Sequence, residues 1–202
     1  MRTQHLALAA AIWLAAAAGG SMAAMNDRET ATLAGGCFWC LEAVFEELSG
    51  VEKVESGFAG GGKGQVTYKQ VCEGGTGHAE VVRIVFDPSR ISYGELLTVF
   101  FSVHDPTTRD RQGADVGPQY RSAVFHHDEA QRAVAVKLIA DLDAAEVFDD
   151  PIVTQVAPFD AFVRADAGHQ DYYRRNRNQP YCQVVIAPKL EDFRETFRDR
   201  LK

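Results

Sequence analysis

The stretch ATLAGGCFWCLEAVFEEL, residues 31–48, places a Gly-Gly pair and two cysteines between an apolar run and a helical pattern. Residues 31–36 are expected to form a strand that ends at the glycines. The apolar residues that follow recur at the spacing of one helix face, at Leu41, Val44, Phe45 and Leu48. Cys37 would then lie at the first turn of a helix. Unpaired backbone N–H groups and the helix dipole at that position favour a thiolate, which predicts a lowered thiol pKa.

The remaining sequence repeats this alternation of strand and helix patterns. Strands are expected at residues 51–59, 80–88, 120–125 and 151–159. Helices are expected to begin after Ser92 and Asp128, which have capping patterns, over residues 167–175, and from Leu190. Residues 104–117 are expected to form a long loop. This order predicts an α+β fold, a two-layer sandwich around a mixed sheet with a split βαβ (ferredoxin-like) core.

Length and composition are those of one soluble domain. The chain has 202 residues, 46% of them hydrophobic and 24% charged, and a net charge of −7. It has no Lys/Arg cluster dense enough for a nucleic-acid footprint, so we expect no nucleic-acid partner. The expected unit is a monomer that needs no cofactor and no metal.

The N-terminal residues follow the layout of a secretory signal peptide. Arg2 precedes an apolar run over residues 6–18, which is too short to span a bilayer, and Ser21–Ala23 fits a small-x-small cleavage site. The prediction is a signal peptide over residues 1–23 and a single catalytic domain over residues 24–202. The protein would be exported, to the periplasm. If translation starts at Met25 instead, the protein would be cytoplasmic.

The chain has four cysteines, which are too few for a disulfide scaffold in a domain of this size: Cys37, Cys40, Cys72 and Cys182. The C-x-x-C pair at Cys37 and Cys40 can support thiol–disulfide exchange. A zinc set of Cys37, Cys40, Cys72 and His78 is the competing interpretation, although the Cys72–His78 spacing is not usual for zinc. Cys72 is expected to pack as a small hydrophobic residue. Phe38 and Trp39 place an apolar surface beside the sulfur, which suits a thioether methyl group.

Four motifs together carry a family resemblance: GGCFWC at residues 35–40, GHAE at 77–80, QYRS at 119–122 and PYC at 180–182. With the sequence around them, from Ala31 to Lys189, they resemble peptide methionine sulfoxide reductase A. The resemblance implies thiol-dependent reduction of the S epimer of methionine sulfoxide, free or in proteins. It also implies a thioredoxin-like dithiol protein as the reductant.

The resemblance assigns roles residue by residue. Cys37 matches the nucleophile, and Phe38 and Trp39 match the pocket that holds the methyl group. Glu80 matches the acid that protonates the sulfoxide oxygen. The remaining matches are two tyrosines that assist that oxygen, a polar pocket residue and a recycling cysteine: Tyr68, Tyr120, Asp115 and Cys182.

The chemistry agrees with these roles. A sulfoxide oxygen leaves only once it is protonated, so Glu80 would have to stay neutral, which burial can achieve. Attack by Cys37 leaves a sulfenic acid that a second thiol converts to an intramolecular disulfide. Both Cys40, which stands where many members have glycine, and Cys182 are candidates for that thiol. We expect Cys182 slightly more, because a disulfide within one helical turn needs distortion and the Asn/Pro-rich segment before Cys182 can move.

Two other function classes remain open from the residues. The first is a thioredoxin-like C-x-x-C protein-disulfide oxidoreductase, and the second is a non-enzymatic zinc-stabilised binding module. Insulin reduction without sulfoxide reduction would favour the first, and stoichiometric zinc would favour the second.

Overall fold

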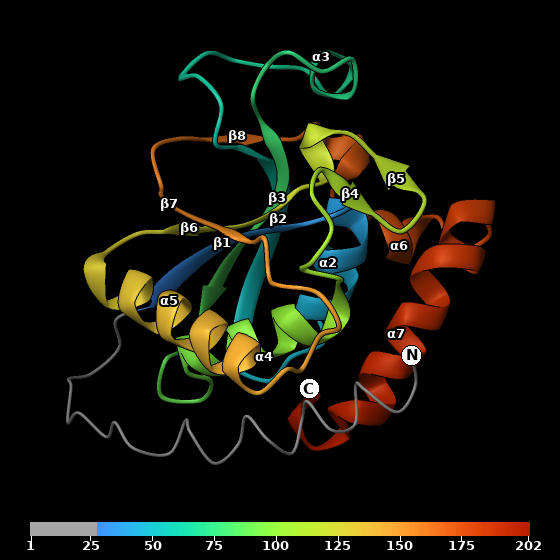
Figure 1. The fold of residues 1–202 in the computed structure, drawn as a ribbon. Coiled ribbons are helices and arrows are strands. Elements are labelled where there is room, and N and C mark those ends of the chain that lie inside the picture. The colour runs from blue at the N-terminus through green and yellow to red at the C-terminus, as the bar shows by residue number, and fades with distance from the viewer. Residues whose placement is uncertain (1–27) are drawn as a thin grey trace.

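The structure is a computed structural model that describes residues 28–202 (Figure 1). Within these residues it has one six-stranded sheet in the order β7-β6-β1-β3-β2-β8 and a separate two-stranded sheet, β4-β5. The strands are β1 Glu29–Gly35, β2 Val51–Ala59, β3 Ala79–Phe86, β4 Arg111–Gln112, β5 Asp115–Val116, β6 Ser122–His126, β7 Gln155–Pro158 and β8 Phe162–Arg164. The predicted signal peptide lies outside the described residues.

The large sheet is mixed. Its neighbouring strands are antiparallel, except for β6 and β7, which are parallel. β3 lies between β1 and β2, the two strands that helix α2 (Phe38–Phe45) connects. The α+β fold around a mixed sheet is confirmed, whereas the ferredoxin-like label stays an interpretation of this strand order.

The other helices are α3 Tyr68–Cys72, α4 Tyr93–Val103, α5 Glu129–Ala144, α6 Tyr172–Arg175 and α7 Ala187–Thr196. The predicted caps are confirmed, because the Ser92 hydroxyl accepts a hydrogen bond from the Glu95 N–H and the Asp128 carboxylate accepts one from the Gln131 N–H. Two expectations were wrong. Residues 104–117 contain the β4-β5 hairpin, and the helix expected over 167–175 is interrupted at Asp171.

The main core lies between the sheet and the helices. Alternate strand residues such as Leu33, Val82 and Ile84 are fully buried on the face covered by α2, α4 and α5 (Figure 1). They pack with apolar residues of α2 and α4, including Phe38, Leu41, Phe45, Leu96 and Phe100. Burial of this surface, at about 25 cal/mol per Å², is the main force that fixes α2 on the sheet.

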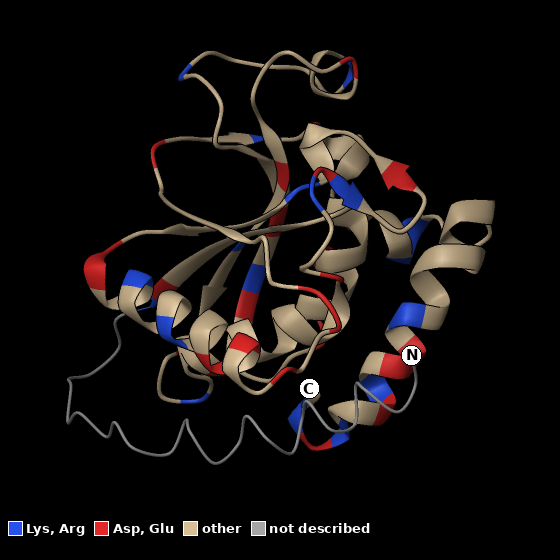
Figure 2. Cartoon of the chain, in the orientation of Figure 1, with Lys and Arg blue, Asp and Glu red and all other residues tan. Residues whose placement is uncertain are grey.

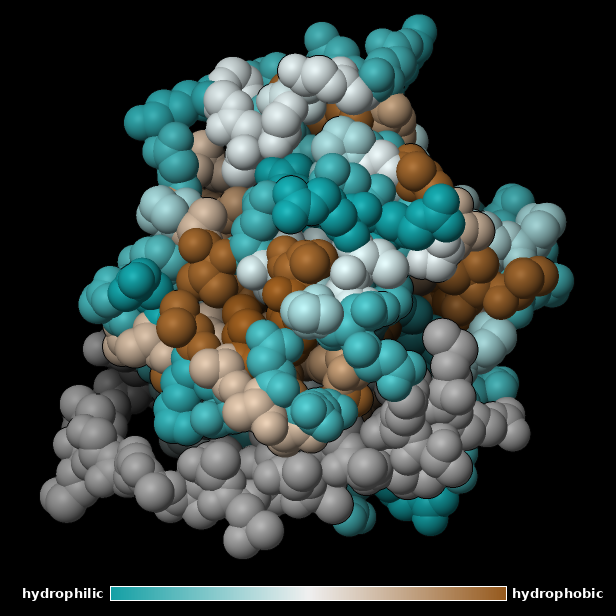
Figure 3. Space-filling model, in the orientation of Figure 1, coloured by the Kyte–Doolittle hydropathy of each residue, from teal (hydrophilic) through white to brown (hydrophobic). Residues whose placement is uncertain are grey.

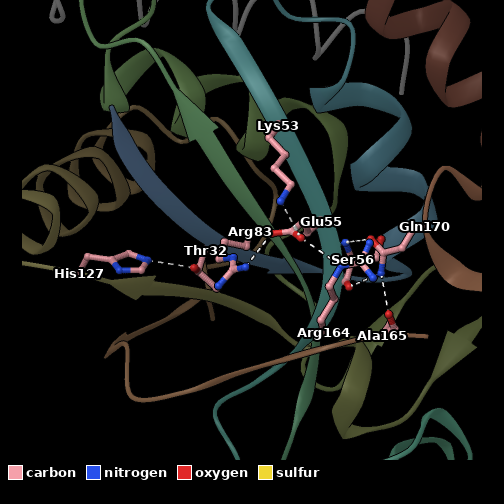
Figure 4. A network of polar contacts seen from close by, with 9 residues as sticks. All are labelled: Thr32, Lys53, Glu55, Ser56, Arg83, His127, Arg164, Ala165 and Gln170. Atoms are coloured by element: carbon pink, nitrogen blue, oxygen red, sulfur yellow. Dashed lines mark hydrogen bonds and ion pairs between the residues drawn. The ribbon is translucent and has the colours of Figure 1, made fainter. Parts of the chain in front are cut away.

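The opposite face of the sheet carries a smaller apolar cluster and a polar network (Figure 4). The Glu55 carboxylate lies 2.9 Å from Lys53 Nζ, 2.6 Å from Arg83 Nη2 and 3.0 Å from Arg164 Nε. Arg83 also lies over the Phe162 ring, 4.2 Å from its centroid. Because these residues belong to β2, β3 and β8, the network joins the short edge strand to the sheet.

In the view drawn in Figure 2, neither acidic nor basic residues form a large uniform region. Figure 2 shows basic and acidic residues interspersed along α5 and α7. Figure 3 shows hydrophobic residues in the middle of this face, bordered by hydrophilic ones. Among residues 28–202, no helix has the length and apolar character needed to cross a membrane.

Candidate active site

The first turn of α2 carries the central thiol. Cys37 is the N-cap residue, with extended backbone at φ −60° and ψ 123°, and its side chain is 7% exposed. The preceding Gly36 has φ +90°, and a Cβ there would lie 2.5 Å from Cγ of Gln112. Only glycine fits both this backbone conformation and this contact. The Gly-Gly bend therefore brings the strand directly into a helix start at the cysteine.

A buried carboxyl faces the same helix start. Glu80 is the second residue of β3, pairs across the sheet with Phe58, and is 1% exposed. Its Oε2 accepts a hydrogen bond of 3.0 Å from the Phe38 N–H. Its Oε1 has no hydrogen-bond partner within the described part of the chain. One carboxyl oxygen is therefore fixed and the other is left for a ligand.

The pKa of Glu80 is raised to about 8. Burial is the largest cause, and the charges of Asp115 and Cys40 act in the same direction, while the Phe38 N–H opposes them. Because this pKa lies above 7, the carboxyl is mostly protonated at neutral pH. This is the state that the sulfoxide chemistry predicted for it.

The pKa values of the two thiols differ from the prediction, which expected the lowered pKa at Cys37. Burial raises the pKa of the Cys37 thiol, and the adjacent Cys40 and Glu80 raise it further. The lowered pKa belongs to Cys40, at about 7, because the Cys37 thiol donates a hydrogen bond to its sulfur and the Lys189 charge also favours the thiolate. The expectation was wrong because it considered the helix terminus alone, without the second buried sulfur.

Tyr181 is a site residue that the sequence reasoning missed. Its hydroxyl donates a hydrogen bond of 2.8 Å to Oδ2 of Asp115 and lies 3.9 Å from Cys40 Sγ. The only signal in the sequence was its position beside Cys182 in the PYC motif. Tyr181 thus links the predicted pocket residue Asp115 to the thiol pair.

Aromatic rings form a wall beside the thiols. Phe38 and Trp39 lie 5.9 Å apart between ring centroids, and Tyr68 stacks near both, at 6.1 and 6.3 Å. Tyr172 stacks on Trp39 at 3.7 Å, and His169 stacks on Tyr68 at 4.3 Å. The structure therefore adds His169 and Tyr172 to the predicted apolar surface.

The two predicted tyrosines lie at this site and are half-buried. Tyr68 begins α3, and Tyr120 ends the short 3₁₀ turn Pro118–Tyr120. Burial raises the pKa of both hydroxyls, and the Glu80 charge adds to the rise in each. Both hydroxyls therefore stay protonated and are available as hydrogen-bond donors near Glu80.

The other two cysteines differ from their predicted settings. Cys72 is exposed, so the expectation that it packs as a small hydrophobic residue was wrong. The short helix α3 ends at Cys72 at the surface. Cys182 is fully buried and begins a π-helical turn, Cys182–Ile186, that continues into α7. Residues 177–179 of the Asn/Pro-rich segment before Cys182 form turns and a bend, whereas Cys182 itself is held in a helical turn. Burial and the Cys40 charge both raise the pKa of the Cys182 thiol.

The zinc alternative finds no support in the geometry. All four cysteines are free, and residues 28–202 contain no group of three or more His, Cys, Asp or Glu side chains arranged to hold a metal ion. His78 of the proposed set instead contacts the Thr76 carbonyl through Nδ1, at 3.1 Å.

Comparison with known proteins agrees with this arrangement. Residues 29–201 match the family model "Peptide methionine sulfoxide reductase". A relative from Chromobacterium violaceum is 55% identical over 174 residues, which cover 86% of this chain and 99% of the relative. One from Natronomonas pharaonis is 52% identical over 172 residues, covering 85% and 97%. Both relatives carry the name peptide methionine sulfoxide reductase MsrA.

Solved structures give the same result. The reduced form of Mxr1 from Saccharomyces cerevisiae superposes with a TM-score of 0.70 at 32% identity, covering 77% of this chain and 89% of that one. Methionine sulfoxide reductase A of Corynebacterium diphtheriae gives 0.67 at 32% identity, covering 79% and 80%. The family model and both relatives match most of this chain, and the two solved structures share its fold. The chain therefore belongs to the peptide methionine sulfoxide reductase family.

Proposed function

We propose that this chain reduces the S epimer of methionine sulfoxide with Cys37 as the nucleophile and Glu80 as the acid. The observation that carries the proposal is the Glu80 carboxyl. It is buried, one of its oxygens is fixed by the N–H of the residue after Cys37, and the other is unpartnered within residues 28–202. A protonated carboxyl in this position can donate its proton to an oxygen bound beside the Cys37 sulfur.

The first step transfers one oxygen atom. The Cys37 thiolate attacks the sulfoxide sulfur, and the substrate oxygen, which takes the Glu80 proton, forms a bond to the Cys37 sulfur as its bond to the substrate sulfur breaks. The products are a thioether and a Cys37 sulfenic acid, so the substrate sulfur is reduced and the Cys37 sulfur is oxidised. Tyr68 and Tyr120 donate hydrogen bonds to the oxygen as its negative charge develops.

The thiol pair supplies the thiolate. Near pH 7 the pair is about half ionised, and its negative charge resides mainly on Cys40 because the pKa of Cys40 is about 7 whereas that of Cys37 is raised. Transfer of the Cys37 proton across the hydrogen bond to Cys40 moves the charge onto the attacking sulfur. Cys40 thus acts as the base for Cys37, and the charged sulfur need not exchange a proton with water.

The aromatic wall suits the substrate's methyl group. Trp39 is partly exposed and stacks on Tyr172, so its ring presents apolar surface beside the thiol, and the fully buried Phe38 packs against it. Contact with a methyl group there removes apolar surface from water and orients the sulfur toward Cys37.

We infer that Cys40 is the first thiol to condense with the sulfenic acid. The reason is that Cys40 is hydrogen-bonded to Cys37, whereas Cys182 is buried at the start of a π-helical turn. The reaction forms the disulfide and releases water. The Cys40 charge raises the pKa of the Cys182 thiol, and we infer that a second exchange passes the disulfide to Cys182.

Disulfide mapping after one turnover without reductant tests this order. We expect a Cys37–Cys40 bridge at the earliest times, followed by a bridge that includes Cys182. In Cys40→Ser the first methionine should still form, and the sulfenic acid should persist long enough to be trapped by dimedone. A Cys37–Cys182 bridge as the first product in the wild type would contradict this order. It would support the sequence-based prediction that Cys182 resolves the sulfenic acid.

A dithiol reductant is needed to complete the cycle, because the disulfide must be opened by thiol–disulfide exchange. We propose a thioredoxin-like protein in this role. The leader pattern in residues 1–23 supports export to the periplasm. There the reductant would in turn need electrons from across the membrane.

The epimer-resolved assay tests the proposed function. The full chain is incubated with dithiothreitol and with separated S and R epimers of methionine sulfoxide. We expect methionine from the S epimer only. Turnover of neither epimer, or reduction of insulin disulfides in the absence of sulfoxide turnover, would contradict the proposal and favour a protein-disulfide oxidoreductase.

A further inference from the structure

Helix α2 carries a second buried carboxyl that the mechanism does not use. Glu42 is 2% exposed and lies one turn after Phe38, on the same side of the helix. A buried carboxylate is strongly unfavourable unless hydrogen bonds compensate for its lost hydration. The groups that bind Glu42 therefore indicate what it holds in place.

Those groups are two backbone N–H groups at the start of α6, together with the side chain of Ser56 on β2. The Tyr172 N–H donates a hydrogen bond of 3.2 Å to Glu42 Oε2, and the Asp171 N–H also donates to the carboxylate. Asp171 has φ +49°, a left-handed conformation that is uncommon for non-glycine residues and that Asp adopts more readily than most. Glu42 thus binds the backbone at a left-handed turn.

The turn places an aromatic ring of the active site. Tyr172 stacks on Trp39 with centroids 3.7 Å apart and planes 8° from parallel. The Trp39 Nε1 is buried and has no hydrogen-bond partner among the described residues. Since no hydrogen bond orients the indole, its position depends on the rings packed against it.

We propose that Glu42 is a positioning residue, whose buried carboxylate holds the start of α6 so that Tyr172 fixes the Trp39 wall of the methyl pocket. This inference rests on the proposed function. Glu42 does not touch the reacting atoms, and its effect on the reaction passes through Tyr172.

A separate anchor keeps the surrounding segment on the sheet. Gln170 is 7% exposed, and its side chain forms three hydrogen bonds: it accepts from the Ser56 N–H at 3.1 Å and donates to the Ser56 and Ala165 carbonyls at 2.8 and 2.9 Å (Figure 4). Loss of Glu42 should therefore release the turn at Asp171 without detaching the whole segment.

The same helix offers a matched control. Glu46, one turn after Glu42, is half-buried and forms a hydrogen bond with the Asp171 side chain, which also pairs with Arg174. Glu46 contacts the side chain at the turn, whereas Glu42 binds the backbone N–H groups. Glu46→Gln therefore changes a carboxylate of the same helix while leaving the backbone contacts intact.

The test uses the full chain with Trp13→Phe, so that Trp39 is its only tryptophan. In this background we expect Glu42→Gln to raise KM for methionine S-sulfoxide about tenfold and to change kcat less than about threefold, because the pocket affects binding more than the chemical step. The acrylamide quenching constant of Trp39 should rise about twofold. Glu46→Gln should leave KM within about twofold of the parent.

A double variant with Tyr172→Ala distinguishes a positioning role of Glu42 from a general effect on protein stability. Tyr172→Ala should raise KM to the same extent as Glu42→Gln, and the double variant should be no worse than either single variant. Additive KM effects, or an unchanged KM with only a lower Tm, would overturn the proposal, as would a KM rise in Glu46→Gln as large as that in Glu42→Gln.

Two further outcomes, a Glu42→Gln variant that does not fold and a parent without sulfoxide turnover, also test the proposal. If Glu42→Gln does not fold, Glu42→Asp, which withdraws the carboxylate by one methylene, is expected to give the same KM rise, and a wild-type KM in that variant would overturn the proposal. If the parent itself does not turn over sulfoxide, the proposed function fails. The quenching data then still decide whether Glu42 holds Tyr172 on Trp39.

Discussion

Replacement of Cys37 by serine is expected to reduce turnover of methionine S-sulfoxide by at least about 10⁴-fold. A serine hydroxyl has no accessible anion near neutral pH and cannot form a sulfenic acid, so both the nucleophile and the oxygen acceptor are lost. Cys37 is also buried, which leaves little room for an external thiol to replace it. The measurement is methionine release with dithiothreitol as reductant.

Cys72→Ser makes the same chemical change at an exposed cysteine and is the matched control. We expect its activity to stay within about twofold of the wild type, because a serine hydroxyl at this exposed position can still accept the hydrogen bond that Cys72 receives from Tyr68. Retained activity in Cys37→Ser, or an equal loss in Cys72→Ser, would show that the nucleophile lies elsewhere.

Glu80→Gln is expected to lower the single-turnover rate at pH 7 by about 10²- to 10⁴-fold. Glutamine keeps the size of the side chain and can still accept a hydrogen bond from the Phe38 N–H, so the fold and the pocket should persist. What it lacks is the acidic proton that the sulfoxide oxygen needs. Glu73→Gln, at an exposed position, is the control and should retain the wild-type rate.

The pH dependence of the single-turnover rate is a second test of the role of Glu80. In the wild type, the rate should fall above about pH 8 because Glu80, with its raised pKa of about 8, loses the proton it donates. The rate should also fall below about pH 7, where protonation of Cys40 removes the thiolate from the pair. The alkaline limb should be absent in Glu80→Gln. A variant that keeps the wild-type rate and both limbs would exclude Glu80 as the acid.

The sequence predicted the central elements because their patterns are local. The Gly-Gly bend, the apolar stripe after Cys37 and the capping residues Ser92 and Asp128 act within a few neighbouring residues, and these elements form where expected. Two of the missed features lack such patterns, whereas the missed helix α3 has one, the capping box of Thr67 and Gln70. The β4-β5 hairpin has only two residues in each strand, and the break at Asp171 depends on a carboxylate about 130 residues earlier in the chain.

The site residues found by resemblance lie together, but their electrostatics could not be predicted one residue at a time. A helix N-terminus alone favours a thiolate at Cys37, whereas the folded chain surrounds that sulfur with Cys40 and Glu80 and buries all three. Tyr181 and Tyr172 were missed or left without a role because each acts through a contact made by the folded chain. Asp115 and Glu42, their partners, lie 66 and 130 residues away.

Transfer of a labelled oxygen atom tests the central chemistry most directly. The variant with both Cys40 and Cys182 replaced by serine is reacted once with methionine S-sulfoxide that carries heavy oxygen, and its peptides are analysed by mass spectrometry. We predict one heavy oxygen on Cys37 for each methionine formed. Methionine formation with the heavy oxygen only in water or on another residue, and none on Cys37, would contradict the account.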